Sequence, residues 1–349
     1  MENKALIAMS GGVDSSVAAY QMQAEGYQCG GAIMRLWEET ASTAVADARE
    51  VAQRLGMDFH VFDATAPFRQ LVVDYFIRSY EEGLTPNPCI QCNRHLKFAY
   101  FLDRALELGY DCIATGHYAT IRQDPQSGRY LLCKAKDAAK DQSYFLACLN
   151  QHQLSHTRFP LGELTKEEVR QIAEEKSFVT ARKKDSQDIC FVPDGDYVAF
   201  MKQYTGKDYP SGNYLDLDGN VVGKHCGAVS YTLGQRKGLG IALGAPVYVC
   251  CKDMQANTVT VGPEAALFAT TLRANSWNWF PFEILTEPIR VMAKARYRHM
   301  PQPATVYPEE SGYARVVFDA PQRAMTPGQT VALYDGDVVV GGGIITEIL

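Results

Sequence analysis

Two cysteines three residues apart lie in a proline-rich segment that could carry thiol chemistry. Cys89 and Cys92 belong to TPNPCIQCN at 85–93, directly before a helical pattern that starts at Arg94. A helix N-terminus favours a thiolate and lowers the thiol pKa, so we expect Cys92 to be reactive. A zinc site would need a second CxxC or a CxxH at finger spacing, and none follows. The segment therefore predicts a nucleophilic thiol.

A third cysteine follows a basic triplet further along the chain. Cys190 lies in DSQDICF at 185–191, after Arg182, Lys183 and Lys184. Taken alone, a cysteine between isoleucine and phenylalanine is more often a core residue. Its role therefore depends on the other motifs of the chain.

A glycine pair near the start of the chain could bind phosphate. The apolar run at 4–9 leads directly into SGGVDSS at 10–16, and an apolar helical pattern follows. Backbone amides at such a helix N-terminus form a cradle for anions. A tight turn capped by Asp14 or Ser15 would need no ligand, but the whole heptad is more specific than a glycine pair. It lacks the Gly-Lys-Ser/Thr of a Walker A loop, so we do not expect a kinase or GTPase site.

A set of basic residues could bind nucleic acid. Arg290, Lys294, Arg296 and Arg298 share one parity, so on a strand they would lie on one face. Few acidic residues stand nearby. A solvated strand face would explain such charges, but binding of phosphates fits them better.

The totals describe a globular protein. Of 349 residues 46% are hydrophobic and 21% charged, with a net charge of -6. This length suggests two or three domains. The charge argues against nonspecific binding of nucleic acid, although local basic surfaces remain possible. The apolar run near the N-terminus is too short for a signal peptide or a membrane span, so we expect a cytoplasmic protein whose ten cysteines are mostly reduced.

The elements that must position these motifs change character along the chain. The first half alternates strand-like and helical patterns, which predicts an α/β fold with a doubly wound, mostly parallel sheet. Ligands of such sheets bind at the carboxyl ends of the strands. We expect this domain at 1–197, a small β-rich central domain at 198–266, and a C-terminal antiparallel β-barrel at 267–349.

Gly116 and His117 would lie at that ligand-binding edge. They follow the apolar run at 111–115, so a nucleotide or RNA could meet them there. A surface histidine after a strand is the simpler reading of His117. Lys140, Asp141 and Gln142 open a later helical pattern, where Asp141 could be merely an N-cap.

The motifs together resemble one enzyme family. SGGVDSS resembles the PP-loop of the ATP pyrophosphatases, which cleave ATP between the α and β phosphates and transfer AMP to a substrate oxygen. With TPNPCIQCN, which Lys97 and Phe98 follow, and DSQDICF, the chain resembles the tRNA-specific 2-thiouridylases. The resemblance extends over essentially the whole chain, through ATGHYA at 114–119, KDQSYFL at 140–146, TLGQRKGLGI at 232–241, KARYR at 294–298, TPGQ at 326–329 and GGGII at 341–345.

This resemblance implies a reaction. ATP with Mg would adenylate the C2 carbonyl oxygen of the wobble uridine (position 34) of a tRNA, and sulfur would then displace AMP. It implies that Cys190 carries the sulfur as a persulfide and that Cys92 is the partner nucleophile. The persulfide could attack the base directly, or Cys92 could first release hydrosulfide. Either route ends in a Cys92–Cys190 disulfide. A sulfur donor protein, either a cysteine desulfurase or a sulfur relay carrier, would load Cys190.

The resemblance also implies binding residues. An adenine nucleotide alpha-hydrolase-like domain would hold ATP, and the barrel would bind tRNA. The implied ATP contacts are Ala8, Met9, Ser10, Gly11, Gly12, Val13, Asp14, Ser15, Met34 and Gly116. The implied tRNA contacts are Asn87, Pro88 and Cys89 at the flipped target base, and His117, Lys140, Asp141, Gln142, Arg296, Tyr297 and Gln329 elsewhere.

One position departs from the family pattern. Where many members have an acidic residue three before the nucleophile, this chain has Cys89. Acid-base assistance from that position is therefore in doubt. Cys89, Cys92 and Cys190 could instead ligate an iron-sulfur cluster with one open iron.

Two other classes of protein share some of these features. A PP-loop synthetase acting on a small metabolite would explain the heptad but not the two separated cysteine motifs. An RNA-binding protein with a structural metal at the CxxC would explain the basic residues but not the heptad. Release of pyrophosphate that depends on tRNA would separate both from a thiouridylase.

Overall fold

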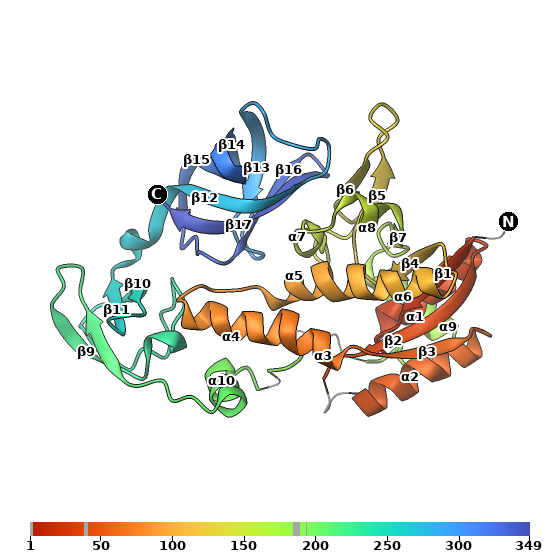
Figure 1. The fold of residues 1–349 in the computed structure, drawn as a ribbon, viewed down its shortest axis with the longest axis horizontal. Coiled ribbons are helices and arrows are strands. Elements are labelled where there is room, and N and C mark those ends of the chain that lie inside the picture. The colour runs from red at the N-terminus through yellow and green to blue at the C-terminus, as the bar shows by residue number, and fades with distance from the viewer. Residues whose placement is uncertain (1–2, 38–40, 184–188, 193) are drawn as a thin grey trace.

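The computed structural model describes residues 3–37, 41–183, 189–192 and 194–349 (Figure 1). Lys184 of the basic triplet and residues 185–188 of the Cys190 motif lie outside the described residues. Within the described part of the chain, no helix is both long and apolar enough to cross a membrane.

The N-terminal domain is built on a five-stranded sheet with the order β3-β2-β1-β4-β7. All four neighbouring pairs are parallel. In the central strand, Ala5 and Ile7 pack on one side and Leu6 on the other, so both faces are buried. The strands are β1 (Lys4–Ala8), β2 (Gln28–Arg35), β3 (Phe59–Asp63), β4 (Cys112–Thr115) and β7 (Thr157–Arg158).

Helices cover both faces of this sheet, which confirms the doubly wound prediction. One face packs against α1 (Val13–Ala24), α2 (Ala41–Arg54) and α9 (Lys166–Glu175). The other packs against a long helix whose buried residues include Ile90, Phe98 and Phe101.

The long helix begins at Pro88, six residues before the predicted start at Arg94. Proline is favoured at a first helical position, where its missing amide would have no partner. The helix comprises α5 (Pro88–Cys92), the π-helical η2 (Asn93–Tyr100) and α6 (Phe101–Glu107). A second helix of this kind precedes it, with α3 (Thr65–Phe68), the π-helical η1 (Arg69–Val73) and α4 (Asp74–Glu81).

A hairpin of β5 (Thr120–Gln123) and β6 (Tyr130–Cys133) leaves this domain, and β6 pairs with strand β17 (Val338–Ile348) of the barrel. The short helices α7 (Ser143–Leu146) and α8 (Gln151–Ser155) follow, and α10 (Tyr197–Thr205) leads toward the central domain. The N-terminal domain and the barrel are thus joined by strand pairing.

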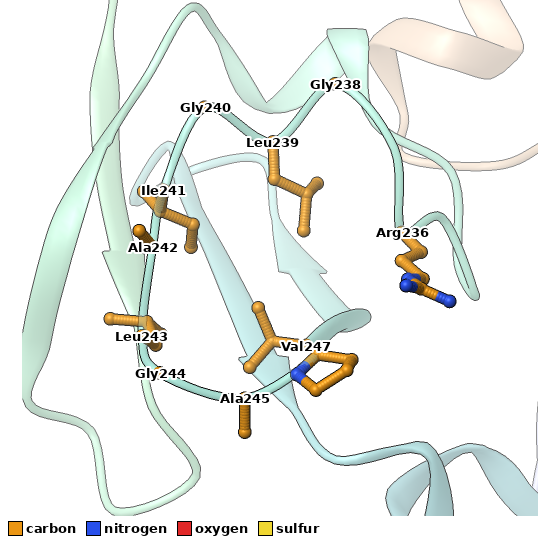
Figure 2. A pocket seen from close by; sticks show the side chains of 11 residues that line it. Arg236, Gly238, Leu239, Gly240, Ile241, Ala242, Leu243, Gly244, Ala245 and Val247 are labelled. Carbon is orange, nitrogen blue, oxygen red and sulfur yellow. The ribbon is translucent and has the colours of Figure 1, made fainter.

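The central domain is a mixed sheet with the order β10-β11-β8-β9. Its strands are β8 (Gly212–Leu215), β9 (Val221–His225), β10 (Tyr248–Asp253) and β11 (Thr258–Gly262), and the short helix η3 (Ala228–Ser230) follows β9. The glycine-rich loop before β10 curves around a cavity of about 370 Å³ lined by Arg236 and residues 238–247 (Figure 2). Leu239 and Ile241 of this loop belong to the core of the domain.

The C-terminal domain is an antiparallel barrel, as predicted. Six strands have the order β12-β15-β14-β13-β16-β17, and pairing of β12 with β17 closes the barrel. The short helices η4 (Glu264–Leu267) and η5 (Glu310–Gly312) precede β12 and β15. The strands are β12 (Phe268–Trp279), β13 (Ile289–Lys294), β14 (Gln302–Pro308), β15 (Ala314–Arg323), β16 (Thr330–Asp335) and β17 (Val338–Ile348).

Candidate functional site

The loop between β1 and α1 has its helix amides uncapped. Gly12 is the N-cap of α1 and no side chain accepts a hydrogen bond there, so neither Asp14 nor Ser15 acts as the cap. The Ser15 hydroxyl donates to the Gly12 carbonyl at 3.0 Å and accepts from the Ser10 amide at 3.1 Å. These bonds hold the loop in shape while the first amides of α1 remain without intrahelical partners, as an anion site requires.

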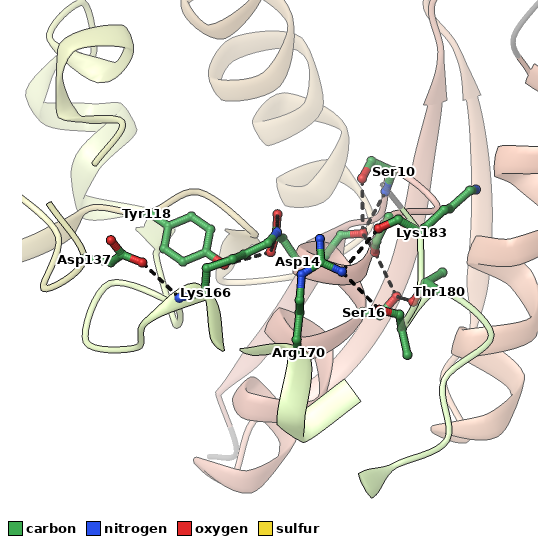
Figure 3. A network of polar contacts seen from close by, with 12 residues as sticks. Ser10, Asp14, Ser16, Tyr118, Asp137, Lys166, Arg170, Thr180 and Lys183 are labelled. Atoms are coloured by element: carbon green, nitrogen blue, oxygen red, sulfur yellow. Dashed lines mark hydrogen bonds and ion pairs between the residues drawn. The ribbon is translucent and has the colours of Figure 1, made fainter. Parts of the chain in front are cut away.

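Asp14 holds the loop to two other elements (Figure 3). Its carboxylate accepts from the Lys166 ammonium at 2.7 and 2.8 Å and from the Tyr118 hydroxyl at 2.8 Å. Lys166 is only 8% exposed, whereas the Asp14 side chain is 31% exposed, so the pair is partly shielded from water. Any contact of Asp14 with ATP or its Mg has to share the carboxylate with Lys166. The sequence offered no signal that singled out Lys166.

Close packing fixes the loop from two sides. A Cβ added to Gly116 would lie 2.7 Å from the Asp14 carbonyl carbon and 2.8 Å from the Ser15 nitrogen. A Cβ on Gly11, whose φ is +69°, would lie 2.6 Å from the Ala44 oxygen of α2. The end of β4 and helix α2 therefore both contact the loop through glycines.

Lys183 adds a third contact. Its ammonium donates to the Gly11 carbonyl at 2.9 Å and pairs with Asp47 of α2. One member of the basic triplet therefore binds the phosphate loop directly.

The remaining predicted ATP residues lie around the same sheet edge. Met9 is buried, with its amide bonded to the Ala32 carbonyl at 2.8 Å. Ala8 is the last residue of β1 and Val13 the first of α1. Met34 is half-buried and packs against both the core under the long helix and the core that contains Cys92. It therefore lies between the core of the sheet and the core that contains Cys92.

The two cysteine motifs meet although they are far apart in sequence. Cys92 is 7% exposed and shares one core with Phe191, the residue after Cys190. The Phe191 ring packs against Phe68 and Phe76, with ring centroids 5.7 and 5.3 Å apart. Cys190 itself is exposed, so the tertiary structure overrides the simple reading of it as a core residue.

The expected lowering of the Cys92 pKa is wrong for this structure. Burial raises the pKa of the Cys92 thiol to about 12, and the Lys97 ammonium only partly opposes this. Because the helix begins at Pro88, Cys92 lies beyond its first turn and inside an aromatic core. Cys89 and Cys190 are exposed residues, but the protein packed around their thiols desolvates them and raises their pKa values, and Lys97 again acts in the opposite direction.

His117 follows β4 at the predicted edge but is not a simple surface residue. Its ring packs against Phe98 and Phe159, with centroids 5.5 and 6.1 Å away. Its Nδ1 lies 2.8 Å from the Thr115 hydroxyl. Burial lowers the His117 pKa well below its usual value, so the imidazole is neutral.

The trio at 140–142 is largely engaged within the protein. The Asp141 carboxylate accepts from the Ala135 amide at 3.1 Å and from the Ser143 hydroxyl at 2.7 Å. Gln142, not Asp141, is the N-cap of α7, and its side-chain oxygen accepts from the Tyr118 amide at 2.9 Å. Lys140 is half-buried beside them.

The predicted basic stripe is not formed. Strand β13 ends at Lys294, so Arg296 and Arg298 lie in the turn beyond it and share no strand face with Arg290. Arg290 is also paired with an acidic residue, because both oxygens of Asp319 accept from its guanidinium at 2.8 and 2.7 Å. Strand termination and this pairing both contradict the sequence-based expectation.

Arg296 and Tyr297 contact other domains. The Arg296 guanidinium donates to the Leu233 carbonyl of the central domain at 3.0 Å and to the Thr326 hydroxyl of the barrel. The Tyr297 ring packs against Phe145 of the N-terminal domain at 4.4 Å between centroids. The turn after β13 is therefore a junction of all three domains.

A turn of the barrel holds the segment that leads to the cysteines. The Thr85 amide donates to the Pro327 carbonyl at 3.0 Å, and the Gln329 side chain donates to the Thr85 carbonyl at 2.8 Å. Both backbone groups of Thr85 are thus bound by the barrel. Asn87 and Pro88 follow directly, and Cys89 is exposed at the start of the helix.

Comparison with known proteins agrees with this architecture. Three family models match in succession: "tRNA methyl transferase HUP domain" at 3–194, "tRNA methyl transferase PRC-barrel domain" at 198–263, and "Aminomethyltransferase beta-barrel domain" at 269–345. The first alone covers more than half of the chain.

Curated relatives are similar over the full length. The "tRNA-specific 2-thiouridylase MnmA" of Clostridioides difficile is 46% identical, over 100% of this chain and 99% of that protein. The proteins of the same description from Acetivibrio thermocellus and Halothermothrix orenii are 48% and 46% identical, over 99% of each chain. The family models speak of methyl transfer, whereas these relatives, which match over the full length, are thiouridylases. The chain therefore belongs to the tRNA-specific 2-thiouridylase family.

Proposed function

We propose that this protein replaces the C2 oxygen of the wobble uridine of a tRNA by sulfur, consuming ATP. One observation carries the proposal. Cys92 and the Cys190 motif share a core that Met34 joins to the edge of the sheet beside an uncapped phosphate loop. Nucleotide and thiol chemistry are therefore neighbours, although their residues come from distant parts of the sequence.

The first step is activation of the base. The uncapped amides of α1 bind phosphate groups of ATP, and the C2 oxygen of uracil attacks the α phosphate, with release of pyrophosphate. Mg bound with ATP would supply positive charge that neutralises its phosphates. Asp14 of the loop fits a role in holding Lys166 better than a role as a free Mg ligand, because its carboxylate is already paired.

The second step is transfer of sulfur. The terminal sulfur of a persulfide on Cys190 attacks C2, and the bond from C2 to the adenylated oxygen breaks with loss of AMP. The Cys92 thiolate then attacks the Cys190 sulfur, so that the persulfide bond breaks and the C2 thiocarbonyl forms. In the alternative order, Cys92 attacks first and the released hydrosulfide attacks C2. Both orders leave a Cys92–Cys190 disulfide, which an external thiol reduces.

The tRNA contacts that this proposal needs lie near the domain junction. Asn87, Pro88 and Cys89 follow Thr85, which Gln329 of the barrel binds. Arg296 and Tyr297 lie in another barrel turn, which contacts the central and N-terminal domains. Several of these side chains bind other domains. Binding of tRNA would then exchange contacts between domains for contacts with RNA.

A cluster on Cys89, Cys92 and Cys190 is a weaker candidate. Among the residues that the structure describes, no three His, Cys, Asp or Glu side chains converge as the ligands of a metal ion would. We therefore assign no step to a cluster. Anaerobic purification followed by iron and acid-labile sulfide analysis tests this assignment, because stoichiometric iron in active protein would contradict it.

The decisive experiment combines the protein with unmodified tRNA, ATP-Mg and a protein persulfide donor, and detects 2-thiouridine by mass spectrometry. We expect the product with the wild type and none with Cys92→Ser or Cys190→Ser. Cys251→Ser is the matched control, because Cys251 is exposed in the central domain, away from the cysteine motifs. Normal thiolation by either variant at 92 or 190 would refute the assignment of these roles.

Release of pyrophosphate separates this function from the other classes. We expect it to depend on tRNA. Release without RNA would indicate a synthetase for a small metabolite, and absence of release under all conditions would indicate a protein that only binds RNA.

A further inference from the structure

Lys97 is a cation beside the cysteines to which the reaction above assigns no role. It lies in η2, five residues after Cys92 and within the same continuous helix. Its side chain is half-buried, between the buried residues Leu96 and Phe98. Among the described residues, no carboxylate forms an ion pair with it.

The π-helical turns bring Lys97 toward the side of the helix that carries Cys92. In an α-helix, residues five apart point about 140° away from each other around the axis. In η2 the hydrogen bonds join residues five apart, as from the Phe101 amide to the Leu96 carbonyl. Such wider turns bring a residue closer in angle to the one five positions earlier than an α-helix does. The π geometry thus reduces the angle between Cys92 and Lys97.

The helix segment that carries Lys97 packs beside both cysteine motifs, because Cys92 and Leu96 share one core with Phe191, the residue after Cys190. Cys89 and Cys92 come from α5, Cys190 from the segment anchored by Phe191, and His117 from the end of β4. The positive charge of Lys97 lowers the pKa of each of the three thiols and also that of His117. The thiols raise one another's pKa values, so Lys97 is the cation that opposes both burial and their mutual repulsion.

The chemistry of sulfur transfer needs anions in this place. A persulfide attacks as its anion and Cys92 attacks as a thiolate, yet burial favours the neutral forms of both. We propose that Lys97 is a positioning residue whose ammonium group stabilises the thiolate of Cys92 and the sulfur anion carried by Cys190. This inference rests on the proposed function, since it gives Lys97 a part in the same thiol chemistry.

The test measures how fast iodoacetamide alkylates each cysteine of the full-length protein between pH 6 and 10, with peptide-resolved mass spectrometry. Lys97→Met removes the charge and keeps the length of the side chain, whereas Lys97→Arg keeps the charge. We expect Lys97→Met to shift the curves of alkylation rate against pH for Cys92 and Cys190 by about one unit toward higher pH. Below the pKa this slows alkylation about tenfold. Lys97→Arg should restore most of the rate.

Two controls make the result specific. Arg94→Met removes a charge from the same helix, at a residue whose charge does not act on these thiols, and should leave their profiles unchanged. Cys251 is the internal reference within each sample, because its reactivity should not respond to Lys97.

Two outcomes would overturn the inference. The first is an unchanged dependence of the alkylation rates on pH in Lys97→Met. The second is an equal loss of alkylation rate in Lys97→Arg and Lys97→Met, which would indicate that Lys97 acts only through packing. Alkylation needs neither ATP nor tRNA, so its result is independent of the thiolation assay. Failure of the wild type to form 2-thiouridine would refute the proposed function, whereas normal thiolation by Cys92→Ser would refute the role assigned to that thiol. Unchanged alkylation in Lys97→Met, with the cysteine variants inactive, would refute only the role of Lys97.

Discussion

Replacement of Gly116 by alanine should weaken ATP binding through a purely steric effect. The new Cβ would lie 2.7, 2.8 and 2.9 Å from the Asp14 carbonyl carbon, the Ser15 nitrogen and the Asp14 Cβ. Two of these are backbone atoms of the first turn of α1, which cannot rotate away as a side chain would. The change tests whether the end of β4 sets the position of the phosphate loop.

The size of the effect follows from these distances. Non-bonded heavy atoms approach comfortably to about 3.5 Å, so the loop or β4 must move by about 0.7 Å. Overpacking of this kind costs about 1 to 3 kcal/mol of stability. A misplacement of about 1 Å can cost about a hundredfold in rate, so a smaller shift of the amides predicts about a tenfold rise in the Kd for ATP, or about 1.4 kcal/mol.

Isothermal titration calorimetry of ATP-Mg binding measures this change, with circular dichroism to confirm folding. Gly128→Ala is the matched control. Gly128 lies between β5 and β6 with a φ of +70° and open space around it, so alanine there should cost about 1 to 2 kcal/mol without affecting the loop. An unchanged Kd in Gly116→Ala, or an equal rise in Gly128→Ala, would refute the reasoning.

Three further perturbations test other contacts. Lys166→Met leaves the partly buried Asp14 without its cation. Because Asp14 keeps some exposure, we expect the free energy of unfolding to fall by about 2 kcal/mol and the Tm of the N-terminal domain by about 4 to 8 °C. Scanning calorimetry measures the Tm, and an unchanged Tm would contradict the pairing. Gln329→Ala removes the hydrogen bond to the Thr85 carbonyl, which contributes about 1 kcal/mol. Amide hydrogen exchange in segment 84–89 should therefore become about five times faster. Unchanged exchange would show that the barrel does not restrain this segment. Because the pKa of Cys92 is raised in the folded protein, the neutral thiol contributes fully to stability below about pH 9, and this contribution is lost as pH rises toward 12. The Tm of Cys92→Ser should therefore fall less steeply above pH 9 than the Tm of the wild type. Parallel curves of Tm against pH would argue against the burial of the thiol.

Local sequence patterns predicted most features of the N-terminal domain. Strand and helix periodicity predicted the parallel sheet, because βαβ units bury both faces of each strand. The glycine pair predicted the uncapped helix start, because local backbone geometry determines where amides are exposed. Pro88 marks the true start of the long helix, a local signal that the prediction of Arg94 overlooked.

Predictions about charge were less reliable. The parity of Arg290 and Lys294 is visible in the sequence, but the end of the strand and the pairing with Asp319 depend on neighbouring strands. The pKa of Cys92 was predicted from the helix dipole alone. Burial by aromatic residues from other elements outweighs that effect.

Sequence alone determined the fold class, the phosphate loop and the family resemblance, because these depend on local periodicity and on contiguous motifs. Only the tertiary structure decided three contacts. Phe191, beside Cys190, packs in one core with Cys92, and Lys166 pairs with Asp14. Gln329 of the barrel donates a hydrogen bond to the Thr85 carbonyl. Each of these contacts joins residues far apart along the chain. Their energies depend on burial and distance, which arise only when separate elements pack together.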